Sequence, residues 1–410
     1  MGTFIAVALA VLAAVPAAMV HYGGLAAPVE IATLLYGIGI VGASFAMAWG
    51  AEAAEHDIPR ALALTVVALL AVFPEYAVDI IFAVKAGQDP TFAPYAAANM
   101  TGSNRLLLGL GWPTVAVIAW LARGQRELAL DRDAGLPLVF LAIATIYSFS
   151  LPFRASIGLI DSLILIALFV VYAVLASREA TEEPDLVGPA AVIGNFSNGP
   201  RRLTILGLFA FAAFVIGTSA EPFADGLVHT GQKLGIDEFL LVQWLAPLAS
   251  EAPEFLVAGL LALRGKAVAA LGLLLSAKVN QWTLLVGSLP LAFSFGAGHP
   301  AALPLDTRQI GEVLLTASQS MFGVAVLASL VYTLGEALLM ALLFFAQLVI
   351  GGVLRAGMHN TQVGETELYA FSIAYILISL IFFIRARKML VSLWRQRNAK
   401  TTDPAVASAR

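Results

Sequence analysis

Several carboxylates occur within stretches of the sequence that are otherwise apolar. Glu75 and Asp79 stand four residues apart in AVFPEYAVDI, and Glu251 and Glu254 stand three apart in APLASEAPEF, so each pair shares one face of a helix. Lys278 follows in the next apolar run, LLLSAKVNQW. Ionisable groups are costly in hydrocarbon, and where they occur there they mark ion or substrate pathways. We therefore expect these stretches to bind a cation.

Amide and hydroxyl side chains accompany the carboxylates and supply neutral oxygens that suit a partly dehydrated cation. Glu75 and Glu254 are the predicted metal ligands, facing each other with the transported cation between them. The other predicted cation-binding residues are Ser103, Asn104, Ser250, Asn280, Glu251, Gln281 and Asn99. The alternative is a pair of glutamates buried in the neutral form and hydrogen-bonded to Asn and Ser, which the symmetric placement of Glu75 and Glu254 disfavours.

A proline directly precedes each of these two glutamates. Pro74 and Pro253 each remove a backbone donor and distort the helix, which frees carbonyl groups where the backbone lines a cavity. We therefore expect Glu75 and Glu254 to lie at helix breaks, one in each half of the chain.

Two basic residues lie close to the acidic ones in sequence. An ammonium at Lys278 supplies the charge of a bound monovalent cation, and two roles for it stay open. In one, Lys278 is a coupling group that releases its proton when the substrate cation arrives; in the other, it forms a permanent salt bridge with Glu251. Arg105 always carries its charge and is predicted to form a structural ion pair with Asp79.

The composition indicates which elements position these residues. Of the 410 residues, 60% are hydrophobic and 12% are charged, and the mean hydropathy is +0.88, far above that of a soluble domain. Apolar runs of about 17 or more residues recur, long enough for a hydrocarbon core of about 30 Å. The absence of cysteine excludes disulfides and thiolate chemistry. The chain is an integral membrane protein. We expect its partners to be inorganic cations and the lipid bilayer, and we expect no nucleic acid.

The apolar runs predict about twelve transmembrane helices. Residues 1–20 lack a basic start, so we expect a retained helix rather than a signal peptide. The predicted helices span about 1–20, 28–54, 58–86, 93–122, 136–152, 157–176, 203–229, 237–263, 267–296, 309–331, 332–354 and 367–386.

The helices form an internal repeat. LDRDAGLPLVF, beginning at Leu130, aligns with LDTRQIGEVLL, beginning at Leu305, and the same offset places Asp161 opposite Glu336, both near helix ends at the membrane interface. Since five helices are an odd number, the second copy inserts upside down. The predicted fold is an all-α polytopic membrane protein of two inverted five-helix repeats with a flanking helix at each end. Its segments are 1–27 (leading helix), 28–176 (repeat one), 177–202 (cytoplasmic linker), 203–354 (repeat two) and 355–410 (last helix and basic tail).

Basic residues predict the orientation. Sixteen of the 23 Lys and Arg residues fall in segments on the side that both termini share. Because cytoplasmic loops carry excess positive charge, both termini are expected in the cytoplasm, in what we expect to be a prokaryotic cell membrane.

The two polar stretches resemble the signatures of the sodium/calcium exchanger family, within the wider cation antiporter superfamily. That family carries a motif close to G-T-S-L-P-E and a second close to G-S-N-x-x-N in each repeat. Pro74-Glu75 and Pro253-Glu254 match the end of the first motif, and Ser250 falls where the family has Thr. The sequence TGSN at 101–104 matches the start of the second. The resemblance covers about residues 28–354 and implies that Na⁺ and Ca²⁺ bind between the repeats.

The departures from the family pattern concern the ligands. Ala71 and Val72 replace two hydroxyls of the first motif, Leu107 replaces the last Asn of the second, and Glu251 and Lys278 replace a Ser and an Asn in repeat two. The expected function is secondary active exchange of inorganic cations by alternating access, Ca²⁺ or another cation against Na⁺ or H⁺, with no cofactor. Two alternatives are a cation/proton antiporter in which Lys278 replaces a sodium site and a non-transporting membrane sensor with this fold.

Motifs for chemistry within the membrane are missing from the sequence. Neither a zinc-binding His-Glu-x-x-His nor a Gly-x-Gly-Asp is present. The five histidines fall near predicted helix ends or in loops, away from the polar stretches. We therefore do not expect an enzyme.

Overall fold

The apolar runs fold into helices, because backbone groups in hydrocarbon must find their hydrogen bonds within the same segment. The computed structural model describes residues 2–54, 57, 73–131, 134–178, 186–358 and 361–401. In the first half the helices are α1 Gly2–His21, α2 Val29–Ala54, α4 Phe73–Gln88, α5 Ala93–Leu106, α6 Trp112–Arg123, α7 Gly135–Ser148, α8 Ser150–Arg154 and α9 Leu159–Ala176. In the second half they are α10 Pro189–Gly194, α11 Asn198–Leu234, α12 Glu238–Leu263, α13 Ala267–Asn280, α14 Val286–Ala297, α15 Thr307–Leu327, α16 Leu334–Met358 and α17 Thr361–Thr401.

Within the described residues, eleven helical spans are long and apolar enough to cross a membrane. They correspond to eleven of the twelve predicted helices, so the all-α polytopic class is confirmed. The twelfth, predicted at 58–86, is represented by α4, and its first part lies outside the described residues. In two places the prediction was incomplete: the linker contains the short helix α10, and α11 already begins at Asn198.

Two pairs of short strands join loops of the two repeats. β1 Glu127–Ala129 pairs with β4 Val331–Thr333, and β2 Ser156–Ile157 pairs with β3 Leu303–Pro304. The loop after the third span of each repeat thus lies beside the loop after the fourth span of the other repeat. Successive loops of a polytopic bundle lie on opposite sides of the membrane, so this pairing requires that the two repeats are inverted.

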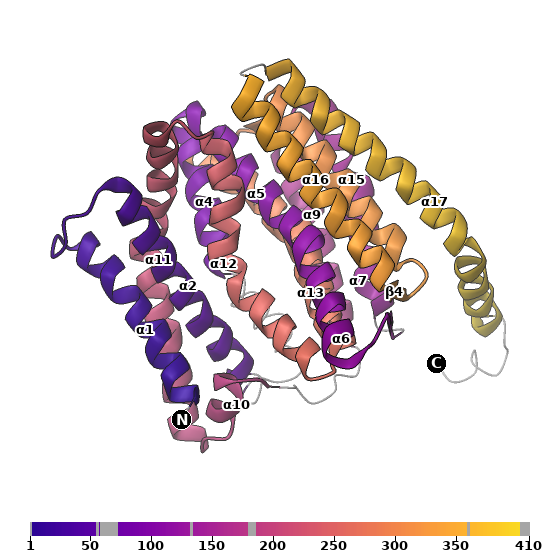
Figure 1. Ribbon diagram of the computed structural model, residues 1–410, viewed down its shortest axis with the longest axis horizontal. Helices are drawn as coiled ribbons and strands as arrows, with labels where there is room; N and C mark the ends of the chain where they lie inside the picture. The colour runs from indigo at the N-terminus through magenta and orange to yellow at the C-terminus, as the bar shows by residue number, and fades with distance from the viewer. Residues whose placement is uncertain are drawn as a thin grey trace.

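The helices of the two repeats alternate in the bundle. α2 packs against α11, α4 against α14, and α5 against α12, so each of these contacts joins one repeat to the other. Figure 1 shows α1, α2 and α11 together at one side, α15, α16 and α17 at the other, and α4, α5 and α12 between them. The helices that carry the two polar stretches therefore occupy the middle of the protein.

Glycines allow the central helices to approach closely. A Cβ added to Gly102 on α5 would lie 1.8 Å from the carbonyl oxygen of Gln243 on α12. Similarly, a Cβ on Gly296 of α14 would lie 2.0 Å from the carbonyl oxygen of Val84 on α4. Side chains on the central helices therefore meet at short range across the repeat boundary.

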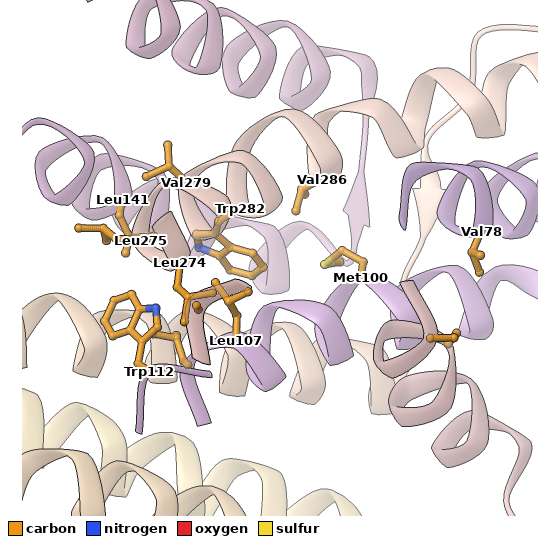
Figure 2. Close-up of a cluster of buried hydrophobic side chains, with 14 of the residues drawn as sticks. Val78, Met100, Leu107, Trp112, Leu141, Leu274, Leu275, Val279, Trp282 and Val286 are labelled. Carbon is orange, nitrogen blue, oxygen red and sulfur yellow. The ribbon is translucent and has the colours of Figure 1, made fainter. Parts of the chain in front are cut away.

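Each polar stretch on the third span ends in a π-helical turn. These turns are η2 Leu107–Gly111 and η4 Gln281–Leu285, at equivalent positions of the two repeats. π-Helical turns are rare and occur frequently at functional sites. Figure 2 shows Leu107, Trp112 and Trp282 in one buried apolar cluster, which holds the two turns in place.

Candidate functional site

A single amide joins carboxylates from both repeats. Nε2 of Gln281 donates to Oε2 of Glu75 on α4 (3.3 Å) and to Oε1 of Glu251 on α12 (3.0 Å). The side chains of Glu75 and Glu251 are buried, with 2% and 1% exposed. Glu254, one turn further along α12, is partly buried and within electrostatic range of Glu75. The three glutamates thus form one acidic cluster at the repeat boundary.

The cluster presents acceptor oxygens without donors. Among the described residues, Oε1 of Glu75, Oε2 of Glu251, Oε2 of Glu254 and Oε1 of Gln281 have no hydrogen-bond partner. Buried carboxylate and amide oxygens in this condition suit a hard cation such as Ca²⁺. In the described part of the chain, no three His, Asp or Glu side chains lie close enough together to hold a metal ion.

Lys278 lies next to the acidic cluster but binds elsewhere. Its fully buried ammonium donates to the carbonyl oxygen (2.9 Å) and Oδ1 (2.6 Å) of Asn104 and lies 4.9 Å from the ring centre of Trp282. Asn104 and Lys278 occupy equivalent positions of the two second motifs, so this contact crosses the repeat boundary. Among the described residues Lys278 makes no ion pair, so the salt bridge to Glu251, one of the two roles that the sequence left open, is not formed. The ammonium instead binds Asn104.

Two further predicted ligands lie around the cluster. Ser103 lies beside both Glu75 and Glu251. Asn280 instead accepts a hydrogen bond at Oδ1 from the hydroxyl of Tyr76 (2.7 Å). Tyr76 was missed from the sequence, although its place next to Glu75 on a predicted membrane helix was a signal. It fixes α13 against α4 directly beside the carboxylates.

The helix break predicted at Pro253 is wrong in part. α12 continues through Pro247 and Pro253 to Leu263, although Figure 1 shows it changing direction along its length. The hydroxyl of Ser250 donates to the carbonyl oxygens of Ala246 (3.2 Å) and Pro247 (3.3 Å), within the same helix. Proline removes one backbone hydrogen bond, and this hydroxyl binds nearby carbonyls, so the helix bends without ending.

Arg105 does not pair with Asp79, and that prediction is wrong. Its Nη1 lies 2.5 Å from Oε2 of Glu312 on α15, Nη2 donates to Gln347 on α16, and its guanidinium lies 5.0 Å from the ring centre of Trp244. The residue of α5 beside Asp79 is Asn99. Arg105 is six residues further on, about 9 Å along the helix axis and on a different face.

The Arg105 cluster extends to the last helix. Gln347 donates to Oε1 of Glu367 on α17 (2.9 Å), and Arg355 lies 3.4 Å from Glu367 and 3.7 Å from Glu312. Nε2 of Gln243 on α12 also donates to Glu312 (2.9 Å). This buried network, with two positive and two negative residues, ties α5 and α12 to α15, α16 and α17. Its sequence signal was the presence of acidic and amide side chains, such as Glu312 and Gln347, within apolar helices.

Asp161 and Glu336 lie at helix ends, as predicted. Oδ2 of Asp161 accepts from the backbone N–H of Gly158 (2.7 Å), and Oδ1 lies 2.6 Å from Nη2 of Arg154. Oε2 of Glu336 accepts from the backbone N–H of Thr333 (2.8 Å). Both carboxylates therefore cap the first turn of a helix.

Comparison with known proteins identifies this arrangement. A family model described as "Sodium/calcium exchanger protein" matches residues 30–178 and 204–352, which is most of the chain. The chain belongs to the sodium/calcium exchanger protein family. A crystal structure of the H⁺/Ca²⁺ exchanger CAX is 42% identical, with 96% of each chain covered and a TM-score of 0.88. No curated protein sequence matches at a significant level.

More distant structures share the fold of this exchanger. The Ca²⁺/H⁺ antiporter protein YfkE is 18% identical over 84% of this chain and 99% of its own, with a TM-score of 0.60. The sodium-calcium exchanger NCX_Mj is 18% identical over 78% of this chain and 98% of its own, with a TM-score of 0.53. The protein is accordingly a multi-pass membrane protein and a cation antiporter.

Proposed function

We propose that this antiporter exchanges Ca²⁺ for protons, with the cation held between Glu75 and Glu254. The observation that carries the proposal is the acidic cluster, whose carboxylates come from both repeats and retain free acceptor oxygens. When ionised, Glu75, Glu251 and Glu254 carry three negative charges, and the ammonium of Lys278 leaves a net charge of minus two. One Ca²⁺ neutralises that charge, and two protons neutralise it equally well after Ca²⁺ leaves.

The position of Lys278 supports protons rather than Na⁺ as the second ion. Its ammonium is covalently part of the chain and donates to Oδ1 of Asn104, a neutral oxygen that could otherwise bind Na⁺. A tethered cation beside Glu75 and Glu251 disfavours additional monovalent cations there but allows each carboxylate to gain a proton. The 42% identity to a protein named as an H⁺/Ca²⁺ exchanger supports the same choice.

Alternating access supplies the transport mechanism. Gln281 and Lys278 of repeat two contact Glu75 and Asn104 of repeat one, so a relative movement of the repeats changes the site directly. In inverted-repeat transporters, one repeat rocks against the other about a fixed central site. Loading with Ca²⁺ or with protons leaves the site uncharged, and a neutral site crosses the apolar barrier at the lowest cost.

Uptake of radioactive Ca²⁺ into proteoliposomes tests the proposal. We expect an outward-directed proton gradient to drive uptake and an equal Na⁺ gradient to leave it at background. The variants Glu75→Gln and Glu254→Gln should abolish uptake, whereas Glu336→Gln, which changes a helix cap, should retain it. Uptake driven by Na⁺ alone would replace protons by Na⁺ as the second ion. No uptake under either gradient, and none of Na⁺ or K⁺, would favour a membrane sensor that does not transport.

For the orientation, we propose that the protein lies in a prokaryotic cell membrane with both termini on the cytoplasmic side. The supporting observation is the excess of Lys and Arg in the segments on the side of the termini. Because the chain has no cysteine, single cysteines can be introduced and labelled individually. In intact cells, a cysteine at Gln125 should resist a membrane-impermeant maleimide and one at His299 should react; the opposite pattern would reverse the orientation.

A further inference from the structure

Three basic residues meet where α6 ends and where α12 turns into α13. Arg123 is the last residue of α6, and Arg264 and Lys266 flank Gly265 in the short loop between α12 and α13. A Cβ added to Gly265 would lie 3.5 Å from Cζ and 3.6 Å from Nε of Arg123, so the guanidinium lies directly against this loop. All three basic residues are exposed. This basic corner, formed by Arg123, Arg264 and Lys266, therefore collects positive charge from two separate segments.

Neither arginine of the basic corner has an acidic partner among the described residues. The ion pairs found there involve other basic residues, such as Arg201 and Arg202 with Asp57. Like charges at short range repel each other and attract an anion into the space between them. A guanidinium also presents its donors in a planar fork that matches the oxygens of a phosphate group. The corner thus offers a phosphate both charge and hydrogen-bond donors.

The inverted repeat builds an equivalent corner on the other side of the membrane. There α4 and α14 take the places that α12 and α6 have in the basic corner, and a Cβ added to Gly87 would lie 2.6 Å from the backbone nitrogen of Ala297. The basic residue in the last turn of α4, Lys85, is bound to Asp225 on α11 (2.6 Å). The close approach of the helix ends therefore does not require an unpaired arginine, and the charge of the basic corner is available for a ligand.

Apolar side chains continue from the basic corner into the membrane. On α6, Trp120 is 38% exposed and Leu121 is 70% exposed, and on α12, Leu263 is 52% exposed. The two helices pack together, with Gly259 of α12 next to Ile118 of α6. Figure 1 shows α6 ending on the side of the molecule where the N-terminus lies. Because tryptophan is enriched at the level of the lipid headgroups, the basic corner lies where headgroups and acyl chains meet.

We propose that the basic corner binds an anionic phospholipid in the leaflet on the side of the N-terminus. The lipid phosphate lies between Arg123 and Arg264, and an acyl chain lies along Leu121 and Leu263. Each Lys or Arg near an anionic membrane surface strengthens binding by about fivefold. A zwitterionic lipid carries the same phosphate, but its headgroup amine is repelled by the arginines. The bound lipid joins the end of α6 to the end of α12, the helix that carries Glu251 and Glu254, and its binding does not depend on which ions are exchanged.

The test uses the full chain in neutral detergent and lipids with brominated acyl chains, which quench the fluorescence of nearby tryptophans. Subtracting the signal of Trp120→Phe in each background isolates Trp120. We expect brominated phosphatidylglycerol to quench Trp120 at about 25-fold lower concentration than brominated phosphatidylcholine, because each of the two arginines contributes about fivefold. The double variant Arg123→Gln/Arg264→Gln should remove this difference. The matched control Arg202→Gln removes an exposed charge that is already paired with Asp57, and it should keep the difference.

Equal quenching of wild-type protein by the two lipids would refute the proposal, and so would a preference that survives in the folded double variant. A preference lost to the same extent in Arg202→Gln would assign it to overall surface charge and refute a site at this corner. Reversal of the quenching by excess glycerol phosphate would refute a lipid as the occupant and assign the corner to soluble phosphate compounds. Thermal unfolding in phosphatidylcholine checks each variant, and the single variant Arg264→Gln, with an expected loss of about fivefold, decides the matter if the double variant does not fold.

Discussion

Replacing Glu312 by methionine is expected to leave Arg105 as an uncompensated charge within the membrane. Nη1 of Arg105 lies 2.5 Å from Oε2 of Glu312, and each side chain is only 1% exposed. At an effective dielectric constant of about 20, the Coulomb attraction over that distance is about 7 kcal/mol. Gln347 and the ring of Trp244 remain as partners of Arg105, so the expected loss of unfolding free energy is smaller, about 3–5 kcal/mol.

The double variant Arg105→Met/Glu312→Met distinguishes a lost ion pair from a lost packing contact. Removing both charges eliminates the buried unpaired group, so the double variant should be more stable than Glu312→Met alone. The matched control is Asp237→Asn. Asp237 lies 2.8 Å from Arg308, but both side chains are about one quarter exposed, and the expected change there is about 0–1 kcal/mol.

The assay is reversible unfolding in mixed detergent micelles, with free energies extrapolated to zero denaturing detergent. The reasoning is refuted if Glu312→Met loses less unfolding free energy than the Asp237→Asn control, or if the double variant is less stable than Glu312→Met alone. Either result would mean that the Arg105 cluster is not a closed electrostatic network.

Three further predictions follow from single contacts. Gly102→Ala places a Cβ 1.8 Å from the Gln243 carbonyl oxygen, so α5 and α12 must separate. We expect a loss of about 1–3 kcal/mol of unfolding free energy, measured by thermal unfolding, and a loss of Ca²⁺ uptake. Unchanged uptake would contradict the close approach of the two helices. Lys278→Met should retain proton-driven uptake but move its half-maximal pH upward, because protons bind more tightly without the ammonium; complete loss of coupling would instead identify Lys278 as the proton carrier. A hydrogen bond from Arg201 lowers the pKa of Asp57 well below its ordinary value. The stabilisation from this ion pair is present above the ordinary pKa of about 3.9 and is lost as pH falls toward the lowered value. The difference in unfolding free energy between the wild-type protein and Asp57→Asn should therefore become smaller in acid. A difference that becomes larger would contradict the role of the ion pair.

The sequence was sufficient for the architecture because bilayer thickness and backbone hydrogen bonding leave few choices. Long apolar runs could only become helices, and an odd number of them per repeat required inversion. The acidic residues were identified because a charged side chain in hydrocarbon has a high free-energy cost, so a carboxylate such as Glu75 or Glu251 in an apolar run must have a functional or structural role. The structure places these two carboxylates on a single amide of Gln281, which the sequence had already included among the polar residues.

Only the tertiary structure decided which polar groups are partners. Asp79 and Arg105 looked complementary in sequence, yet the rotation of α5 directs Arg105 to Glu312, more than two hundred residues away. Lys278 approaches Asn104 rather than Glu251 because the inverted repeats bring equivalent positions together at their common boundary. Helical periodicity and hydropathy are local properties that the chain specifies by itself. The facing of one helix toward another depends on packing among all of them, and so the pairing of buried charges becomes definite only in the folded bundle.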